Sequence, residues 1–238
     1  MAERKEYFLK KIYPEHLAEM RAIGRRIVDV RVQDPLDNEK RYSEFRENDW
    51  LHFEDTNHEV LKASVRYCRH YDSIENLLIN EGIENVWPNA KTLKEAIELS
   101  VGFPGYAENI EKNGVYSLCI KKLAVYVAGP YSGTRKEKIR NIKNAEKIAR
   151  EVAKMGYIPL VPHKLFEFWE DEGFGEKACM ALEKDLLQDK SDFFYFINPS
   201  NGTNKELAMA REIMPIFISL ENLRFWKPVK TESKSKSS

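Results

Sequence analysis

Apolar positions in the second half of the chain follow two alternating spacings. Short apolar runs of the kind that form buried strands cover residues 123–128, 157–161, 193–197 and 216–219. Apolar positions at helical spacing cover residues 135–154, about 176–188 and about 204–213. Strands that alternate with amphipathic helices imply right-handed crossovers between parallel strands. The pattern therefore predicts an α/β domain in which helices cover both faces of a parallel sheet, as in Rossmann-like folds.

The first 120 residues show shorter and less regular patterns. Strand patterns cover residues 27–32, 50–53, 60–67 and 116–120. Helical patterns cover about 14–23, 73–80 and 93–99. Ser73 and Thr92 stand where helix caps are expected, and Glu95 follows Thr92 at the spacing of a capping box. We expect this half to form an α+β domain, a small and mostly β barrel with helical insertions.

The two patterns meet near Lys121 and Lys122. A chain of 238 residues suits two domains, because a domain usually holds about 100 to 150 residues. The change of pattern therefore predicts one domain over residues 1–121 and a second over 122–228. Residues 229–238 are polar and of low complexity, so we expect a disordered tail there.

Charge and cysteine content narrow the function classes. The 38 Lys and Arg residues balance the 38 Asp and Glu residues, which argues against an electrostatic grip on nucleic acid by the whole molecule. Cys68, Cys119 and Cys179 are far apart and odd in number, which favours buried thiols in a reducing compartment over disulfides or a zinc site. No apolar run approaches the ~18 residues that span a bilayer. We therefore expect a cytoplasmic protein that does not enter a membrane.

Residues 198–210 are the most informative stretch of the chain. They follow the apolar run 193–197 and lead into a helical pattern, so they read as a strand end, a polar turn and a helix start. The first amides of a helix lack intrahelical partners and bind anions. Ser200 and Gly202 would let the backbone approach such an anion, while Glu206 would direct a carboxylate at the molecule that carries it. The combination favours a sugar phosphate held beside a nucleophile.

Three motifs of the second half carry a family resemblance. They are residues 126–133 (Tyr-Val-Ala-Gly-Pro-Tyr-Ser-Gly), Asp185-Leu186, and Ser200-x-Gly-x-x-x-Glu206. Together they resemble the nucleoside 2-deoxyribosyltransferase superfamily. A serine six residues before the glutamate is most similar to the 2′-deoxynucleoside 5′-monophosphate N-glycosidase branch. The resemblance covers about residues 123–219.

The resemblance implies a mechanism with two carboxylates, as in retaining glycosidases. Glu206 would attack C1′ of the sugar, and Asp185 would orient it or handle the proton of the leaving base. Glu183 and Asp189 lie close enough in sequence to be confused with Asp185. Without the surrounding motifs, Glu206 would be read as a carboxylate that complements a helix dipole. The chemistry calls for no metal and no cofactor, because the leaving base activates the sugar carbon.

The same resemblance implies a substrate-binding set around a 5′-phosphate. Ser200, the amides near Gly202 and the glycine turn that follows the first strand would hold the phosphate. Tyr126 or Tyr131 would contact the sugar or stack on the base, and the alternative for both is packing in the core or at the rim. His163 is either a ligand contact or a structural loop histidine. The implied substrate-binding residues are Tyr126, Gly129, Tyr131, Ser132, Gly133, His163, Ser200 and Gly202.

One departure from the family pattern affects the choice of function. Many members have a second glycine before the catalytic glutamate, whereas this chain has Asn204 and Lys205 there. The leading hypothesis is hydrolysis of a deoxy or modified nucleoside monophosphate. Base exchange between deoxynucleosides is a second hypothesis, and a non-catalytic sensor in which Glu206 only caps its helix is a third. A homodimer is compatible with all three, because related enzymes often complete their pockets across a dimer.

The first half resembles another family, the ASCH domain, which is related to PUA RNA-binding modules. The resemblance rests on residues 24–31, 47–53 and 71–82 and covers about residues 7–120. Residues alternate inward and outward along a strand, so at least one of Arg25, Arg26 and Arg31 could reach a binding groove into which Asp29 also points. The alternative for Arg25 is a solvated, charged strand. Some ASCH proteins resemble amidohydrolases that use a lysine and a threonine, but here these positions hold Arg26 and Asp29. Because an arginine cannot act as a general base, we interpret this half as a module that binds a nucleotide or RNA.

Overall fold

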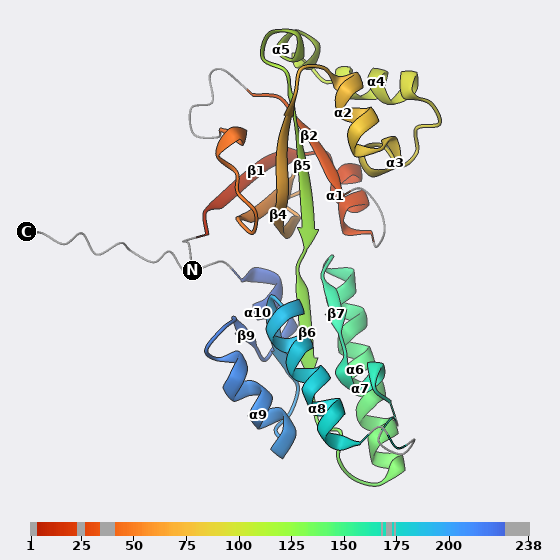
Figure 1. Ribbon diagram of the computed structural model, residues 1–238, viewed down its shortest axis with the longest axis vertical. Helices are drawn as coiled ribbons and strands as arrows, with labels where there is room; N and C mark the ends of the chain where they lie inside the picture. The colour runs from red at the N-terminus through yellow and green to blue at the C-terminus, as the bar shows by residue number, and fades with distance from the viewer. Residues whose placement is uncertain are drawn as a thin grey trace, which may run out of the picture. The chain divides into compact units, whose positions relative to one another are not determined.

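The computed structural model describes residues 4–22, 27–33, 41–167, 169, 173 and 175–226, and the tail expected at 229–238 lies outside them. The chain forms two compact units, coloured red to green and green to blue in Figure 1. The first comprises Met1–Leu123 with Ala153–Ile158, and the second comprises Ala124–Val152 with Pro159–Ser238. Within the described residues, no helix is both long and apolar enough to cross a membrane.

The first unit is built on a five-stranded mixed sheet with the strand order β1-β3-β4-β5-β2. Its strands are β1 Glu6–Ile12, β2 Val28–Arg31, β3 Trp50–Asp55, β4 Val60–Tyr71 and β5 Val115–Lys122. Strand β1 runs parallel to β3, whereas the other neighbours are antiparallel. Among the described residues β1 and β2 form the two edges and do not pair, so the sheet is open and a closed barrel is not shown.

Helices of the first unit carry the caps that the sequence predicts. They are α1 Pro14–Arg21, α2 Ile74–Glu81, α3 Ile83–Val86, α4 Leu93–Val101 and α5 Tyr106–Asn113, with a 3-10 turn at Tyr42–Glu44. Ser73 accepts a hydrogen bond from the Asn76 amide, and Thr92 accepts one from the Glu95 amide. The apolar side of α2 then packs with β2 and β5 in one buried cluster. Both predicted caps are confirmed.

The second unit has a smaller α/β architecture with the strand order β7-β6-β8-β9. Its strands are β6 Ala124–Ala128, β7 Ile158–Leu160, β8 Phe193–Phe196 and β9 Ile216–Phe217. Strand β8 pairs in parallel with both β6 and β9. Every residue of β6 is buried, as expected for a parallel strand that is covered on both faces. The predicted parallel sheet with helices is confirmed.

The helices of the second unit fix where its polar groups can gather. They are α6 Arg135–Lys154, α7 Pro162–Leu165, α8 Glu176–Asp185, α9 Asn201–Ala210 and α10 Leu220–Phe225, and a π-helical segment at Leu186–Lys190 continues α8. Helix α6 has the predicted bounds. Helix α9 begins three residues earlier than the periodicity indicates, because Ser200 caps it by accepting a 3.1 Å hydrogen bond from the Thr203 amide.

An apolar cluster on one face of this sheet holds α9 and the π-helical segment against the strands. Tyr126 of β6 and Phe194 of β8 stack with ring centroids 5.7 Å apart. Leu187 of the π-helical segment and Ala210 of α9 pack against these rings, and all four side chains are fully buried. The cluster therefore fixes the C-terminal half of α9 and leaves its N-terminal half at the ends of β6 and β8.

We predict that Phe194→Ala destabilises the second unit by about 3 to 5 kcal/mol, because it leaves a cavity beneath α9 in a closely packed core. Urea unfolding followed by circular dichroism measures the change. Phe225→Ala is the matched control: Phe225 is 69% exposed, so its loss changes the free energy of unfolding by about 0.5 kcal/mol or less. Equal effects of the two substitutions would contradict this account of the core.

Candidate active site

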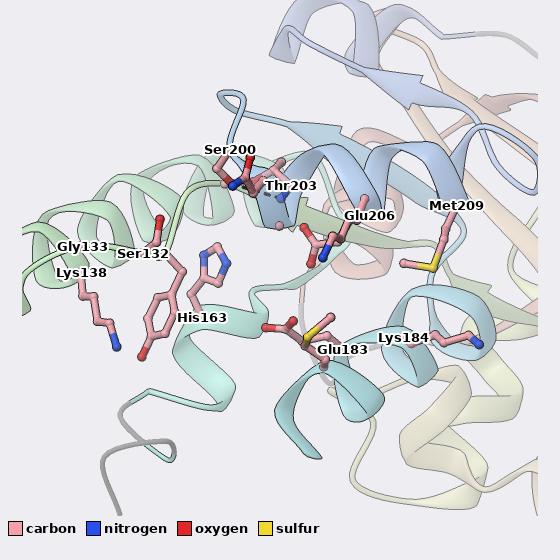
Figure 2. A pocket seen from close by; sticks show the side chains of 16 residues that line it. Ser132, Gly133, Lys138, His163, Glu183, Lys184, Ser200, Thr203, Glu206 and Met209 are labelled. Atoms are coloured by element: carbon pink, nitrogen blue, oxygen red, sulfur yellow. Dashed lines mark hydrogen bonds between the residues drawn. The ribbon is translucent and has the colours of Figure 1, made fainter. Parts of the chain in front are cut away.

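A cavity of about 790 Å³ with polar and apolar walls opens in the second unit, within the size range of ligand pockets. Side chains from the turn after β6 and from α6, α7, α8 and α9 surround it, as Figure 2 shows. Its lining residues are Gly129, Tyr131, Ser132, Gly133, Lys138, His163, Met180, Glu183, Lys184, Ser200, Asn201, Gly202, Thr203, Lys205, Glu206 and Met209. Eight of the ten residues that the sequence singles out in this half are in this set.

Glu206 is the most deeply placed acid of the cavity. Its residue is 8% exposed, and its Oε1 accepts a 2.6 Å hydrogen bond from the Tyr126 hydroxyl. Burial raises the pKa of Glu206, and the hydrogen bond from Tyr126 opposes that rise by favouring the ionised form. The carboxylate is therefore poorly hydrated but oriented by a fixed donor.

Tyr126 supports Glu206 and does not face the cavity. The residue is fully buried and is not among the lining residues, so its ring does not reach a ligand in the way the sequence suggests. Burial, together with the charges of Glu206 and Glu183, raises the pKa of the phenol well above its usual value. The hydroxyl thus stays protonated and remains a donor to Glu206. Tyr131, the other tyrosine expected at the ligand, does line the cavity.

The second predicted carboxylate, Asp185, lies away from the cavity. It is exposed and not among the lining residues, whereas Glu183, two residues earlier on α8, is half-buried and lines the cavity. In Figure 2 the side chains of Glu183 and Glu206 both project into the space between α8 and α9. The pairing of Glu206 with Asp185 is therefore not seen, and Glu183 occupies the facing position.

The start of α9 forms one wall of the cavity. The Ser200 hydroxyl accepts a hydrogen bond from the Thr203 amide at 3.1 Å and shares another with the Thr203 hydroxyl at 2.7 Å. Ser200 is therefore committed to capping the helix. The first intrahelical hydrogen bond of α9 runs from the Asn204 amide to the Ser200 carbonyl. The amides of Asn201 and Gly202 therefore lack an intrahelical acceptor and are the donors that this wall offers to an anion.

The turn after β6 forms the opposite wall. Gly133 has a φ of 118°, which side-chain-bearing residues rarely adopt. A Cβ at Gly129 would come within 3.2 Å of the Ile197 side chain, so the turn passes close to the end of β8. The Tyr131 ring stacks on His163 at 5.0 Å, and the Lys138 ammonium lies 4.9 Å from the centroid of the same ring. The turn thus offers backbone, aromatic and cationic groups to one ligand.

His163 is a buried polar group of this wall. The residue is 6% exposed, and its Nδ1 has no hydrogen-bond partner among the described residues. Burial lowers the pKa of His163 to about 4, so the ring is neutral at physiological pH. The neutral ring lines the cavity, but its unsatisfied Nδ1 is itself buried, so the ligand-contact and structural interpretations of His163 both stay predictions.

Residues predicted to bind ligands in the first unit are only partly described. Arg25 and Arg26 lie outside the described residues. Arg31 Nε donates to Asp29 Oδ2 at 2.5 Å, and both side chains are largely buried, so these two residues satisfy each other. No disulfide joins the three cysteines, and no cluster of at least three His, Cys, Asp or Glu residues that could hold a metal occurs in the described part of the chain.

A buried carboxylate of the first unit escaped the sequence analysis. Glu81 accepts hydrogen bonds from Tyr67 at 2.5 Å, Tyr71 at 2.7 Å and Ser117 at 2.7 Å. Burial would raise the pKa of Glu81, but these donors outweigh it and lower the pKa. Because its donors come from two strands, Glu81 joins α2 to the sheet. The motif at residues 71–82 contains Tyr71 but gave no sign of this, since Tyr67 and Ser117 lie outside it.

Comparisons with known proteins find one family model and two solved structures that are similar to part of this chain. A family model described as "Domain of unknown function (DUF7768)" matches residues 123–217. No curated protein matches the chain. The crystal structure of hypothetical protein PH0355 is 26% identical, covers 49% of this chain and 97% of its own, and has a TM-score of 0.41. The solution structure of protein PF0455 from Pyrococcus furiosus is 26% identical, with 49% and 96% coverage and a TM-score of 0.37.

We predict that Tyr126→Phe raises the pKa of Glu206 further, because it removes the donor to the ionised carboxylate while the ring still packs on Phe194. Titration of the ¹³C-labelled Glu206 carboxyl by NMR measures the change. Tyr195→Phe, a buried phenol on β8 with no hydrogen bond to Glu206, is the control and leaves that pKa in place. An unchanged or lower pKa in Tyr126→Phe argues against the hydrogen bond.

We also predict that the His163 ring does not titrate between pH 8 and pH 5, because its pKa in the folded protein is about 4. Two-dimensional ¹H–¹⁵N spectra of the imidazole follow its protonation. In urea the same ring should titrate near pH 6.5, the value of an unperturbed histidine. Since the folded pKa is the lower one, His163 favours folding above about pH 6.5, and this contribution is lost as the pH falls towards 4. A folded-state transition near pH 6.5 would show that the ring is hydrated.

Proposed function

We propose that the second unit hydrolyses the N-glycosidic bond of a nucleoside 5′-monophosphate, deoxy or modified, with Glu206 as the nucleophile. The observation that carries this proposal is the buried Glu206 carboxylate, which Tyr126 orients inside a cavity of about 790 Å³. Glu206 forms no ion pair with a cation among the described residues and is held by one hydrogen-bond donor. A nucleophilic carboxylate in covalent catalysis at a sugar carbon needs such an arrangement.

The chemistry follows from the position of this group. Glu206 attacks C1′, a C1′–O bond forms, and the C1′–N bond breaks with its electron pair leaving on the base. The low-dielectric surroundings that raise the pKa of Glu206 also favour charge neutralisation, so they assist attack on a centre that resembles an oxocarbenium ion. Water then releases the sugar phosphate from Glu206.

The 5′-phosphate is assigned to the region between the two walls of the cavity. The first-turn amides of Asn201 and Gly202 and the turn at Gly129–Gly133 provide backbone donors. Lys138 adds a positive charge beside the turn. In this proposal Ser200 acts through the helix that it caps, and the stacked Tyr131 and His163 rings contact the sugar or the base.

The first unit is proposed to bind a nucleotide or RNA as an ASCH-like, PUA-related module. The support is the sequence resemblance over residues 7–120 together with a mixed sheet that carries helical insertions between β4 and β5. Among the described residues of the motif at 24–31, Asp29 is paired with Arg31 and is not a free general base. This pairing fits binding better than amide hydrolysis.

We predict that the protein releases free base from at least one member of a panel of ribo- and deoxyribonucleoside 5′-monophosphates, and that Glu206→Gln lowers kcat by roughly a thousandfold or more. Liquid chromatography of the free base measures the reaction. Glu212→Gln, the same substitution at an exposed position just beyond α9, is the matched control and keeps the activity. Release of base from no member of the panel would end the hydrolase proposal.

The same assay separates the alternatives. A free second base that raises turnover and yields a new nucleotide identifies base exchange. Binding of a monophosphate that is unaffected by Glu206→Gln, with no product, identifies a sensor whose glutamate is structural.

A further inference from the structure

Two acids lie in the last turn of α8 and a third lies on the π-helical segment that continues it, and of these one lines the cavity. Glu183 is half-buried and lines the cavity, whereas Asp185 and Asp189 are exposed and outside its lining. Residues two apart on an α-helix are rotated by about 200° from each other, so Glu183 and Asp185 cannot both face the same space. Only one of these two residues can therefore face the cavity.

Glu183 also lies within electrostatic reach of the Tyr126–Glu206 pair. Its charge contributes to raising the pKa of the Tyr126 phenol, after burial and the charge of Glu206. Figure 2 shows Glu183 on α8 and Glu206 on α9, both projecting into the cavity. Two carboxylates from separate helices thus share one cavity, and only one of them, Glu206, accepts the hydrogen bond of Tyr126.

We infer that Glu183, and not Asp185, is the acid and base partner of Glu206 in the reaction. This inference rests on the proposed hydrolase function and assigns a second catalytic residue to it. The two carboxylates would then have different roles because their surroundings differ, as in glycosidases that use one acid as nucleophile and the other as proton carrier.

The proton balance of the two steps is complete with Glu183 in this role. In the first step protonated Glu183 gives its proton to the base nitrogen as the C1′–N bond breaks and Glu206 bonds to C1′. In the second step ionised Glu183 takes a proton from water while the water oxygen attacks C1′. The bond between Glu206 and C1′ then breaks, its electron pair returns to Glu206, and Glu183 is protonated for the next cycle.

Three variants of α8 test the assignment on the panel substrate that the unaltered protein hydrolyses fastest. Glu183→Gln keeps the shape of the side chain but cannot carry the proton, so we expect kcat to fall about a hundredfold or more. The kcat of Asp185→Asn should stay at least about tenfold higher than that of Glu183→Gln. Asp189→Asn, an exposed acid on the π-helical segment, is the matched control and should stay within about twofold of the unaltered protein.

A second readout separates proton transfer from a structural effect. The base of 7-methylguanosine 5′-monophosphate is positively charged before cleavage and leaves without being protonated, unlike the base of guanosine 5′-monophosphate. If Glu183 gives a proton to the leaving base, Glu183→Gln should lose much less activity on the methylated nucleotide. Melting temperatures of the three variants confirm that each is folded.

The outcomes distinguish this inference from the function on which it rests. An unaltered protein that hydrolyses no substrate overturns the proposed function, and the role of Glu183 with it. An active protein in which Asp185→Asn loses more than Glu183→Gln overturns only the assignment of Glu183. If Glu183→Gln loses the same fraction of activity on guanosine and 7-methylguanosine 5′-monophosphate, the assignment is also overturned, because only the base of the first needs a proton to leave.

Discussion

The hydrogen bond from Tyr126 to Glu206 is the interaction on which the second unit depends. It joins the centre of a parallel sheet to the middle of α9 at 2.6 Å, where Tyr126 is fully buried and Glu206 is 8% exposed. A buried carboxylate without a donor would cost several kcal/mol, so the phenol determines where α9 can lie. The Ser200 cap and the packing of Ala210 then fix the two ends of the same helix. The same contacts therefore hold both the core of the second unit and the candidate site in place.

At Glu206, the burial that favours reactivity of the carboxylate also lowers the stability of the folded protein when that carboxylate is ionised. Burial places the folded-state pKa of Glu206 above its unfolded value of about 4.5, so the folded chain binds the proton more tightly. Stability is therefore highest below the unfolded pKa and falls as the pH rises through the folded pKa. When Glu206 is ionised, its charge stands in a place that disfavours charge. Such a group is retained at functional sites, where a poorly hydrated carboxylate can react.

The sequence predicted those parts of the structure that depend on local spacing. The bounds of α6 and the caps at Ser73 and Thr92 follow from periodicity and from short-range hydrogen bonds. The parallel pairing of β1 with β3 could not be foreseen, because it joins segments that share no turn signal. The choice between Glu183 and Asp185 depends on the rotation of α8 about its axis, which the packing of the unit sets. A motif gives the type of residue but not the face on which it lies.

The charges around the cavity provide an orientation as well as an attraction. Lys184 and Lys205 are exposed, Lys138 is half-buried, and all three line the cavity, whereas Glu206 lies at its buried end. An anion is drawn to the lysines and repelled by Glu206 and Glu183, and the effect is strong because the buried end is poorly screened. Lys138 and Lys184 lie on opposite sides of the cavity in Figure 2, and only Lys138 lies beside the turn after β6. Under the proposed function, the anionic end of a substrate would be held towards Lys138 and its neutral part directed at Glu206. The extra cation at Lys205, which departs from the family pattern, also lines the cavity.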